Sequence, residues 1–182
     1  MKIHVLATGA VFLGPGVRSF EQAVLQSMRE ARREIQILAY LITAGAELFL
    51  DAIQDALSRH VTVTLVVNDL DALSGDVRRK LIGMERKFPE CFHFYSFRRA
   101  AEGDMHAKLV IADRRTVILG SANMTWRGGV VNHEIGVMIE GPPAWELAAM
   151  VDHLVVYLKN RMRSFQGLLP GQSSKQQKEP PQ

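Results

Sequence analysis

Short apolar runs alternate with amphipathic stretches through the first half of the chain, and this alternation limits the fold most strongly. Residues 61–67, VTVTLVV, form a β-branched run typical of a strand buried on both faces. Apolar residues recur at helical spacing in 20–35, 47–58 and 75–88, and further strands are expected near the N-terminus, at 35–42 and at 91–97. The alternation predicts an α/β sandwich with a mixed sheet flanked by helices.

The second half predicts a hairpin, one more strand and a long helix. The hairpin strands are expected at 106–112 and 116–120, joined by the turn DRRT, and the next strand at 134–139. A helix is expected from Ala144 to about Arg163, after two prolines. Residues 166–182 are polar and rich in proline and glutamine, so a disordered tail is expected there, leaving one domain over 1–165.

Composition narrows the function classes only a little. The net charge of +3 permits an anionic partner without requiring one. The single cysteine, Cys91, excludes an intrachain disulfide and a C-x-x-C zinc site. The apolar run at 5–13 is short and interrupted, so it is interpreted as a strand entering a loop rather than a signal peptide, and a cytoplasmic location is expected.

The predicted hairpin carries two side chains that can be positively charged. His106 and Lys108 share one face of the expected strand because side chains alternate. The alternate positions, expected to enter the core, are Ala107, Leu109 and Ile111. The returning strand delivers Ser121 and Asn123 to the same end. An imidazole, an ammonium, a hydroxyl and an amide together suit a phosphodiester, whose anionic oxygens need donors and whose phosphorus a neutral histidine can attack.

The orientation of His106 requires a hydrogen-bond partner on its other ring nitrogen. Glu134, at the start of the next apolar strand, is the candidate. Taken singly, these residues have ordinary structural interpretations, since a lone histidine in a strand is usually structural and DRR is a common polar turn. The joint spacing distinguishes the segment from those alternatives.

That spacing is H-x-K-x4-D-x6-G-S-x-N, and this chain meets it without a gap at His106, Lys108, Asp113, Gly120, Ser121 and Asn123. It resembles the HKD signature of the phospholipase D superfamily. The Asn-x-Glu of Asn132 and Glu134 and the strand ending near Tyr40 are also similar to the family pattern, and the resemblance covers roughly residues 15–160.

The resemblance implies a phospholipase D-like catalytic domain that works through a phosphohistidine intermediate, without a metal or other cofactor. It makes His106 the nucleophile, with Lys108 and Asn123 holding nonbridging phosphate oxygens and Ser121 assisting. Glu134 would orient His106. Asp113 would play a supporting part, because the hairpin turn separates it from His106.

The same chemistry requires a second histidine to protonate the leaving oxygen. None of the other histidines has a lysine two positions later; these are His4, His60, His93, His133 and His153. One chain therefore carries one HKD motif and half a site, which predicts a two-fold homodimer like the small stand-alone nucleases of the family.

Three functions remain open at this stage. The first is a phosphodiesterase that acts as a metal-independent endonuclease on DNA or RNA. Its expected nucleic-acid contacts are Arg98, Arg99, Arg114, Arg115 and Arg127, with Trp126 stacking on a base. The second is a phospholipid phosphodiesterase or phosphatidyltransferase, although no stable membrane association is expected because no anchor is evident. The third is a nucleic-acid-binding subunit of a larger complex.

Overall fold

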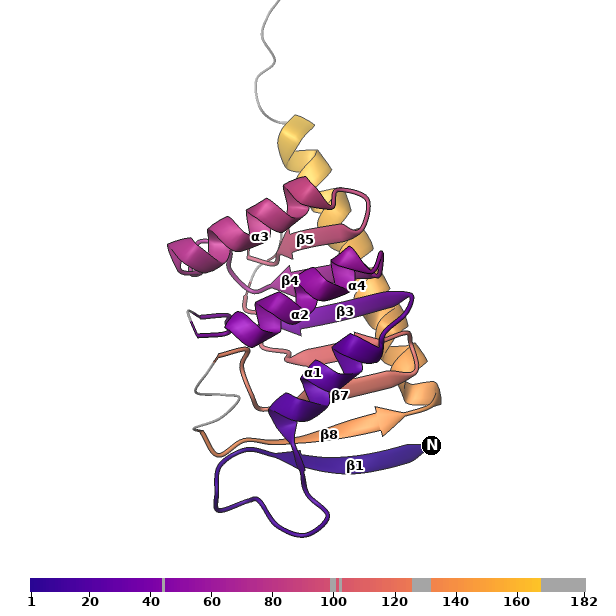
Figure 1. Ribbon diagram of the computed structural model, residues 1–182. Helices are drawn as coiled ribbons and strands as arrows, with labels where there is room; N and C mark the ends of the chain where they lie inside the picture. Colours follow the sequence, from indigo (N-terminus) through magenta and orange to yellow (C-terminus); the bar gives the residue numbers. More distant parts are fainter. Residues whose placement is uncertain (44, 99–100, 102, 126–131, 168–182) are drawn as a thin grey trace, which may run out of the picture.

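The fold is built on a single mixed sheet with helices on both faces. The structure, a computed structural model, describes residues 1–43, 45–98, 101, 103–125 and 132–167 (Figure 1). Its strands are β1 (Lys2–Ala7), β2 (Arg18–Ser19), β3 (Glu34–Ala39), β4 (Thr62–Val67), β5 (Phe92–Ser96), β6 (Leu109–Ala112), β7 (Thr116–Gly120) and β8 (Ile135–Glu140). Its helices are α1 (Phe20–Glu30), α2 (Glu47–Ser58), α3 (Gly75–Lys87) and α4 (Pro142–Gly167).

The strand order is β2-β1-β8-β7-β6-β3-β4-β5. Strands β3, β4 and β5 are parallel and are connected by helices, whereas β6, β7 and β8 pair antiparallel with their neighbours. Helices α1, α2 and α3 cover one face of the sheet, and α4 crosses the other (Figure 1). The expected α/β sandwich with a mixed sheet is confirmed.

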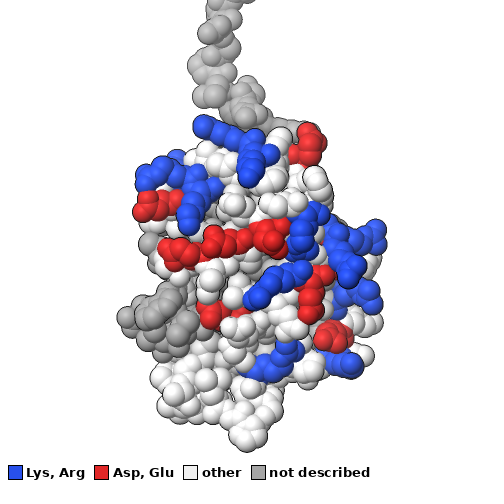
Figure 2. Space-filling view, in the orientation of Figure 1, with Lys and Arg blue, Asp and Glu red and all other residues white. Residues whose placement is uncertain are grey.

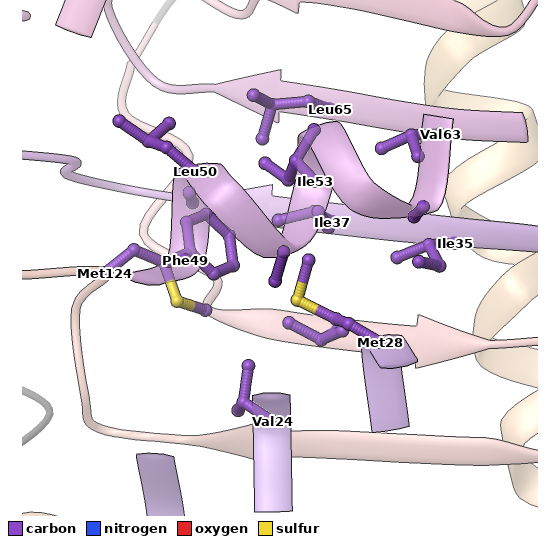
Figure 3. Close-up of a cluster of buried hydrophobic side chains, with 14 of the residues drawn as sticks. Val24, Met28, Ile35, Ile37, Phe49, Leu50, Ile53, Val63, Leu65 and Met124 are labelled. Carbon is purple, nitrogen blue, oxygen red and sulfur yellow. The ribbon is translucent and has the colours of Figure 1, made fainter. Parts of the chain in front are cut away.

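The face under α1–α3 holds the larger apolar core. Figure 3 shows Met28 of α1 and Ile53 of α2 packed over Ile37 and Leu65 of the sheet, and all four side chains are buried. Ser19 caps α1, since its hydroxyl accepts the Gln22 N–H at 3.4 Å. Strands β3 and β4 contribute apolar side chains to both cores, with Ile37 and Leu65 under α1–α3 and Leu38 and Val66 on the opposite face.

The opposite face, hereafter the α4 face, has a second core. The α4 residues Ala144, Ala148, Val151 and Leu158 are buried against side chains such as Ile111 and Val117. The helix runs to Gly167, two residues past the expected domain boundary, and residues 168–182 of the expected tail lie outside the described residues. None of the helices in the described ranges is long and apolar enough to cross a bilayer.

The first strand of the hairpin is shorter than expected. Strand β6 begins at Leu109, where it pairs with Leu38, so residues 106–108 precede the strand. Ala107 is exposed rather than buried in the core, because β3 ends at Ala39 and offers no further strand for residues 106–108 to pair with. Both faces of β6 are buried: Val110 belongs to the core under α1–α3 and Ile111 to the α4 core.

Candidate functional site

Four segments of the chain meet at one end of the sheet, where β3 ends, β6 begins, β7 ends and β8 begins (left-hand ends in Figure 1). The antiparallel pairing of β6, β7 and β8 produces this convergence. The Gly120 N–H donates to the Lys108 carbonyl at 3.4 Å, and the Ser121 N–H donates to the Ile135 carbonyl at 3.0 Å. The segments that carry His106, Lys108, Ser121 and Glu134 therefore adjoin one another.

His106 and Lys108 contact each other directly, as their spacing predicts. The Lys108 Nζ lies 3.2 Å from the His106 Nδ1 and donates to the His106 carbonyl at 2.9 Å. The Tyr40 ring, from the end of β3, packs against the imidazole with the ring centroids 4.4 Å apart. The Lys108 Nζ also lies 5.1 Å from the centroid of the Tyr40 ring. The imidazole itself is exposed, so a substrate can reach it.

Lys108 is the buried charge of the site, with 8% of its surface exposed. Burial lowers its pKa because the ammonium loses water, and the negative charge of Glu134 opposes that shift. The amine thus lies in a poorly solvated position where it attracts an anion more strongly than a surface lysine does.

Glu134 is held by three residues that flank the ends of β1, β7 and β8. Its carboxylate accepts a hydrogen bond from the Ser121 hydroxyl and another from the Asn132 amide at 3.2 Å. Its backbone carbonyl accepts the Thr8 N–H at 3.0 Å. Among the described residues, no hydrogen bond joins Glu134 to His106 in this state of the protein, so the orienting part expected for Glu134 stays a prediction.

Asn123 presents a polar group that no described residue satisfies. Its Oδ1 is buried and makes no hydrogen bond within the described part of the chain. The bridge between Ile42 and Met124 holds the adjoining segment beside the end of β3. An amide oxygen is an acceptor, so a water molecule or another hydrogen-bond donor suits it, and leaving it unsatisfied costs about 1–3 kcal/mol.

The segment leading into His106 is anchored by Asn68, which sequence reasoning missed. The Asn68 side chain is buried, accepts the Met105 N–H at 2.8 Å and donates to the Asp104 carboxylate at 3.1 Å. Both bonds fix the two residues before His106. The only signal in the sequence is a lone asparagine directly after a buried apolar strand, a position common at functional edges of α/β sheets.

Arg98 belongs to the same anchor. Its guanidinium lies 3.4 Å from Asp104 and 3.6 Å from Asp69. Two carboxylates therefore offset the charge that we expected to contact nucleic acid. The expected contacts at Arg99, Trp126 and Arg127 lie outside the described residues.

The structure does not bring the turn residues of the hairpin to His106, because the turn lies at the opposite end of β6. There Asp113 accepts the backbone N–H groups of Arg32, Arg33 and Glu34 at 2.8–3.2 Å. Burial raises the pKa of Asp113, but these bonds outweigh it and hold the pKa below its ordinary value.

Arg114 and Arg115 occupy the same remote end. Arg114 pairs with Glu34 and, at 2.7 Å, with Asp152, and Arg115 lies in the same turn. Figure 2 shows that Lys and Arg side chains gather on this side of the visible face, at the right. The described residues bring no three of His, Cys, Asp and Glu close enough together to hold a metal ion.

The sequence matches the family described as "Cardiolipin synthase, PLD-like domain" over residues 24–160. No curated protein matches the sequence.

Three solved structures share the fold. NucT from Helicobacter pylori is 19% identical, with a TM-score of 0.64 over 90% of this chain and 96% of that one. The phospholipase D family member Nuc from Salmonella typhimurium is 22% identical, with a TM-score of 0.60 over 89% and 94%. Phosphatidylserine synthase from Haemophilus influenzae is 15% identical, with a TM-score of 0.59 over 87% of this chain but 39% of that one.

The family match spans most of the chain, and the three structures have the same mixed sheet and helices. This chain belongs to the phospholipase D superfamily of phosphodiesterases.

Proposed function

We propose that this protein is a metal-independent nuclease that cleaves phosphodiester bonds through a phosphohistidine on His106, at a site completed by a second copy of the chain. The observation that carries the proposal is the contact between an exposed imidazole and a buried lysine, next to the Ser121–Glu134 pair. In this arrangement Lys108 and Asn123 bind the nonbridging oxygens, and Ser121 assists.

The proposed reaction has two balanced steps. His106 Nε2 attacks phosphorus, a P–N bond forms, the P–O bond to the leaving group breaks, and the second imidazole donates its proton to that oxygen. Water then attacks phosphorus, the now neutral second imidazole takes the water proton, and the P–N bond breaks. The products are an alcohol and a phosphate monoester, and His106 returns to its starting state.

In this scheme Glu134 binds His106 only when a substrate is present. An Nε2 nucleophile carries its proton on Nδ1, where it needs an acceptor, and the Lys108 ammonium near Nδ1 is not one. A bound phosphate would draw the ammonium toward its oxygens. The ring would then be released to donate from Nδ1 to Glu134.

Nucleic acid is the substrate class we favour. The chain covers 96% of NucT and 94% of Nuc, so the match takes in nearly all of each of those chains, whereas it spans 39% of the phosphatidylserine synthase chain. The small net positive charge of the chain is compatible with binding a polyanion. The contacts expected from Arg98, Arg99, Trp126 and Arg127 remain predictions.

Phospholipid is a second candidate because of one loop beside the site. Residues 9–17 carry no charge, and Val11, Phe12 and Leu13 are exposed there. The Phe12 ring packs edge-on against His133, next to Glu134. Exposed apolar residues at such a place suit a lipid surface, and the matched family is described by a lipid synthase.

Cleavage assays on labelled single-stranded DNA, RNA and phosphatidylcholine vesicles, all with EDTA present, test the proposal. We expect DNA or RNA to be cut, and His106→Ala to lower the rate by about 10³-fold or more without unfolding the protein, because the nucleophile is lost. His93→Gln, in β5 away from the site, is the matched control and should keep full activity.

Cleavage of the vesicles alone would move the assignment to the phospholipid candidate. Full nuclease activity of a folded His106→Ala protein would refute the proposed nucleophile. Loss of wild-type activity on adding EDTA would refute the metal-independent scheme.

A further inference from the structure

Glu134 must keep its backbone in place while its carboxylate changes partners. In the structure the carboxylate accepts hydrogen bonds from Ser121 and Asn132, whereas the proposed reaction requires it to accept one from the Nδ1 of His106. A rotation of the side chain can make this exchange only if the backbone that carries it stays fixed. Strand β8 begins one residue later, at Ile135, so residues 132–134 lie outside the strand that would fix them.

Thr8, which directly follows β1, fixes the backbone at two of these three residues. Its N–H donates to the Glu134 carbonyl at 3.0 Å, and its hydroxyl donates to the Asn132 carbonyl at 2.8 Å. Thr8 is only 4% exposed, so water competes little for either bond. The Asn132 amide in turn donates to the Glu134 carboxylate. Thr8 therefore holds both the backbone of Glu134 and the residue that binds its carboxylate.

The residue between them, His133, packs against the loop that follows Thr8. A β-carbon at position 9 would lie 2.7 Å from the His133 Cδ2 and 2.8 Å from its Cγ, so the imidazole rests directly on the Gly9 backbone. Gly9 also has a φ of 83°, a conformation that favours glycine. The Phe12 N–H donates to the Gly9 carbonyl at 3.0 Å, and the Phe12 ring meets the imidazole edge-on with the centroids 5.7 Å apart.

These contacts exceed what the sheet itself requires. The antiparallel pairing of β1 with β8 ends at Ala7 and Ile135, and the Thr8 N–H alone would extend it by one bond. The hydroxyl bond to Asn132 and the glycine at position 9 are additional, and both act on the residues beside Glu134. Figure 1 shows this loop, in indigo, beside the segment that enters β8.

We propose that Thr8 and Gly9 are positioning residues for Glu134, and through it for the His106 nucleophile. They hold residues 132–134 against the end of β1, so that the Glu134 carboxylate can leave Ser121 and accept the Nδ1 proton of His106 without a shift of its backbone. Neither residue contacts the substrate in this scheme. The inference rests on the proposed function, which assigns Glu134 to His106.

Replacing Thr8 tests the hydroxyl bond. Thr8→Val keeps the shape of the side chain but removes the donor to Asn132. On the oligonucleotide that the wild type cleaves, we expect kcat to fall about tenfold and KM to change less than about twofold, because the substrate contacts remain. Thr8→Ser keeps the hydroxyl and should restore kcat. Thr116→Val, in β7 at the turn end of the hairpin, is the matched control and should keep full activity.

A double-mutant cycle shows whether Thr8 acts through Glu134. Glu134→Ala removes the carboxylate and should lower kcat by itself. Once the carboxylate is gone, adding Thr8→Val should cost less than about twofold more. The same tenfold cost in both backgrounds would overturn the inference. A Thr8→Ser protein as impaired as Thr8→Val would overturn it too, because the hydroxyl would then not be the group that matters.

Replacing Gly9 tests the loop by a separate route. The β-carbon of Gly9→Ala would push the His133 ring, and Glu134 with it, away from the end of β1. We expect kcat to fall about tenfold or more while the circular dichroism spectrum stays unchanged. Gly14→Ala is the matched control in the same loop, because a β-carbon there meets nothing within 4 Å. Equal activity of the two variants would refute the part assigned to Gly9.

These outcomes separate from those of the proposed function. An active His106→Ala protein, or a Glu134→Ala protein with the wild-type kcat, would refute the proposed reaction itself. Full activity of Thr8→Val and Gly9→Ala, with His106→Ala and Glu134→Ala both impaired, would refute the positioning inference alone.

Discussion

Lys108 places a positive charge where folding alone would not favour one. The amine is buried and its pKa is lowered by that burial, so at neutral pH the folded state carries an unfavourable charge. Its bonds to His106 compensate only in part. Such a residue is expected where function outweighs stability, since an anionic substrate would supply the missing counter-charge.

Lys108→Met should therefore separate activity from stability. We expect kcat to fall about 10²- to 10³-fold, because one donor to the phosphate is lost, and the melting temperature to stay unchanged or rise. Since the folded-state pKa of Lys108 lies below its unfolded value near 10.4, the stability advantage of the variant should shrink as pH rises through the lowered pKa. Cleavage rates and thermal melts across pH measure both effects.

Lys80→Met, at an exposed α3 position, is the control for the loss of one lysine. It should leave both activity and melting temperature near the wild-type values. A large loss of stability in Lys108→Met would show that the amine is mainly a structural group.

At the scale of elements, the two ends of the β6–β7 hairpin have different functions. Its open end delivers His106, Lys108 and Ser121 to the candidate site. Its turn places Asp113 and Arg114 in the left-handed backbone region, with φ values of 52° and 53°, and Asp113 binds the segment leading into β3. The turn thereby fixes β6 against β3, the strand that ends beside the site.

Asp113→Asn should weaken this attachment without changing the chemistry. Asparagine tolerates the same backbone conformation, but a neutral amide accepts the three N–H groups less strongly, so the free energy of unfolding should fall by about 2 kcal/mol at neutral pH. Because the folded-state pKa of Asp113 is lowered, the wild-type advantage is present above its ordinary pKa and is lost as pH falls through the lowered pKa. Denaturant unfolding across pH measures the change.

Cleavage by Asp113→Asn should stay within about twofold of wild type, because the turn is remote from His106. Asp51→Asn, at an exposed α2 position, is the control. A folded, stable Asp113→Asn protein with little activity would contradict the structural part assigned to this carboxylate.

Local patterns of apolar residues predicted the helices and strands well, because the packing in the fold buries the faces that these patterns mark. The helix expected at 47–58 matches α2, and the DRRT turn is confirmed. Long-range effects explain what local patterns missed. The start of β6 depends on where β3 ends, which the sequence of β6 cannot reveal. The Asn68 anchor joins residues 37 positions apart, and the two-residue β2 depends on pairing with β1.

The candidate site could be predicted better than the substrate contacts, because the pairing of β6, β7 and β8 brings the residues of the spaced motif close together. His106, Lys108, Ser121 and Glu134 adjoin as the hairpin requires. Substrate contacts could not be predicted in the same way, since a surface arginine has no periodicity that fixes its partners. Arg98 and Arg114, expected to contact nucleic acid, each pair with carboxylates of their own chain, and their contacts with nucleic acid remain predictions.

At the scale of the whole molecule, one chain presents one exposed imidazole with its lysine, and the proposed reaction needs two imidazoles. Each dimer would then contain a single composite site rather than two independent ones. This arrangement makes activity depend on the composition of the dimer, which a mixture of subunits can reveal.

Co-expression of wild-type and His106→Ala chains in equal amounts should yield both homodimers and the mixed dimer in random proportion. If both imidazoles are required, the mixture should retain roughly a quarter of the activity of the same amount of wild-type protein, whereas independent subunits would retain roughly half. Mixed dimers isolated through two different affinity tags should be inactive, because one histidine cannot serve as nucleophile and as acid in the same step. Half-active mixed dimers would mean that each chain holds a complete site, and the second acid would then have to come from the same chain as His106.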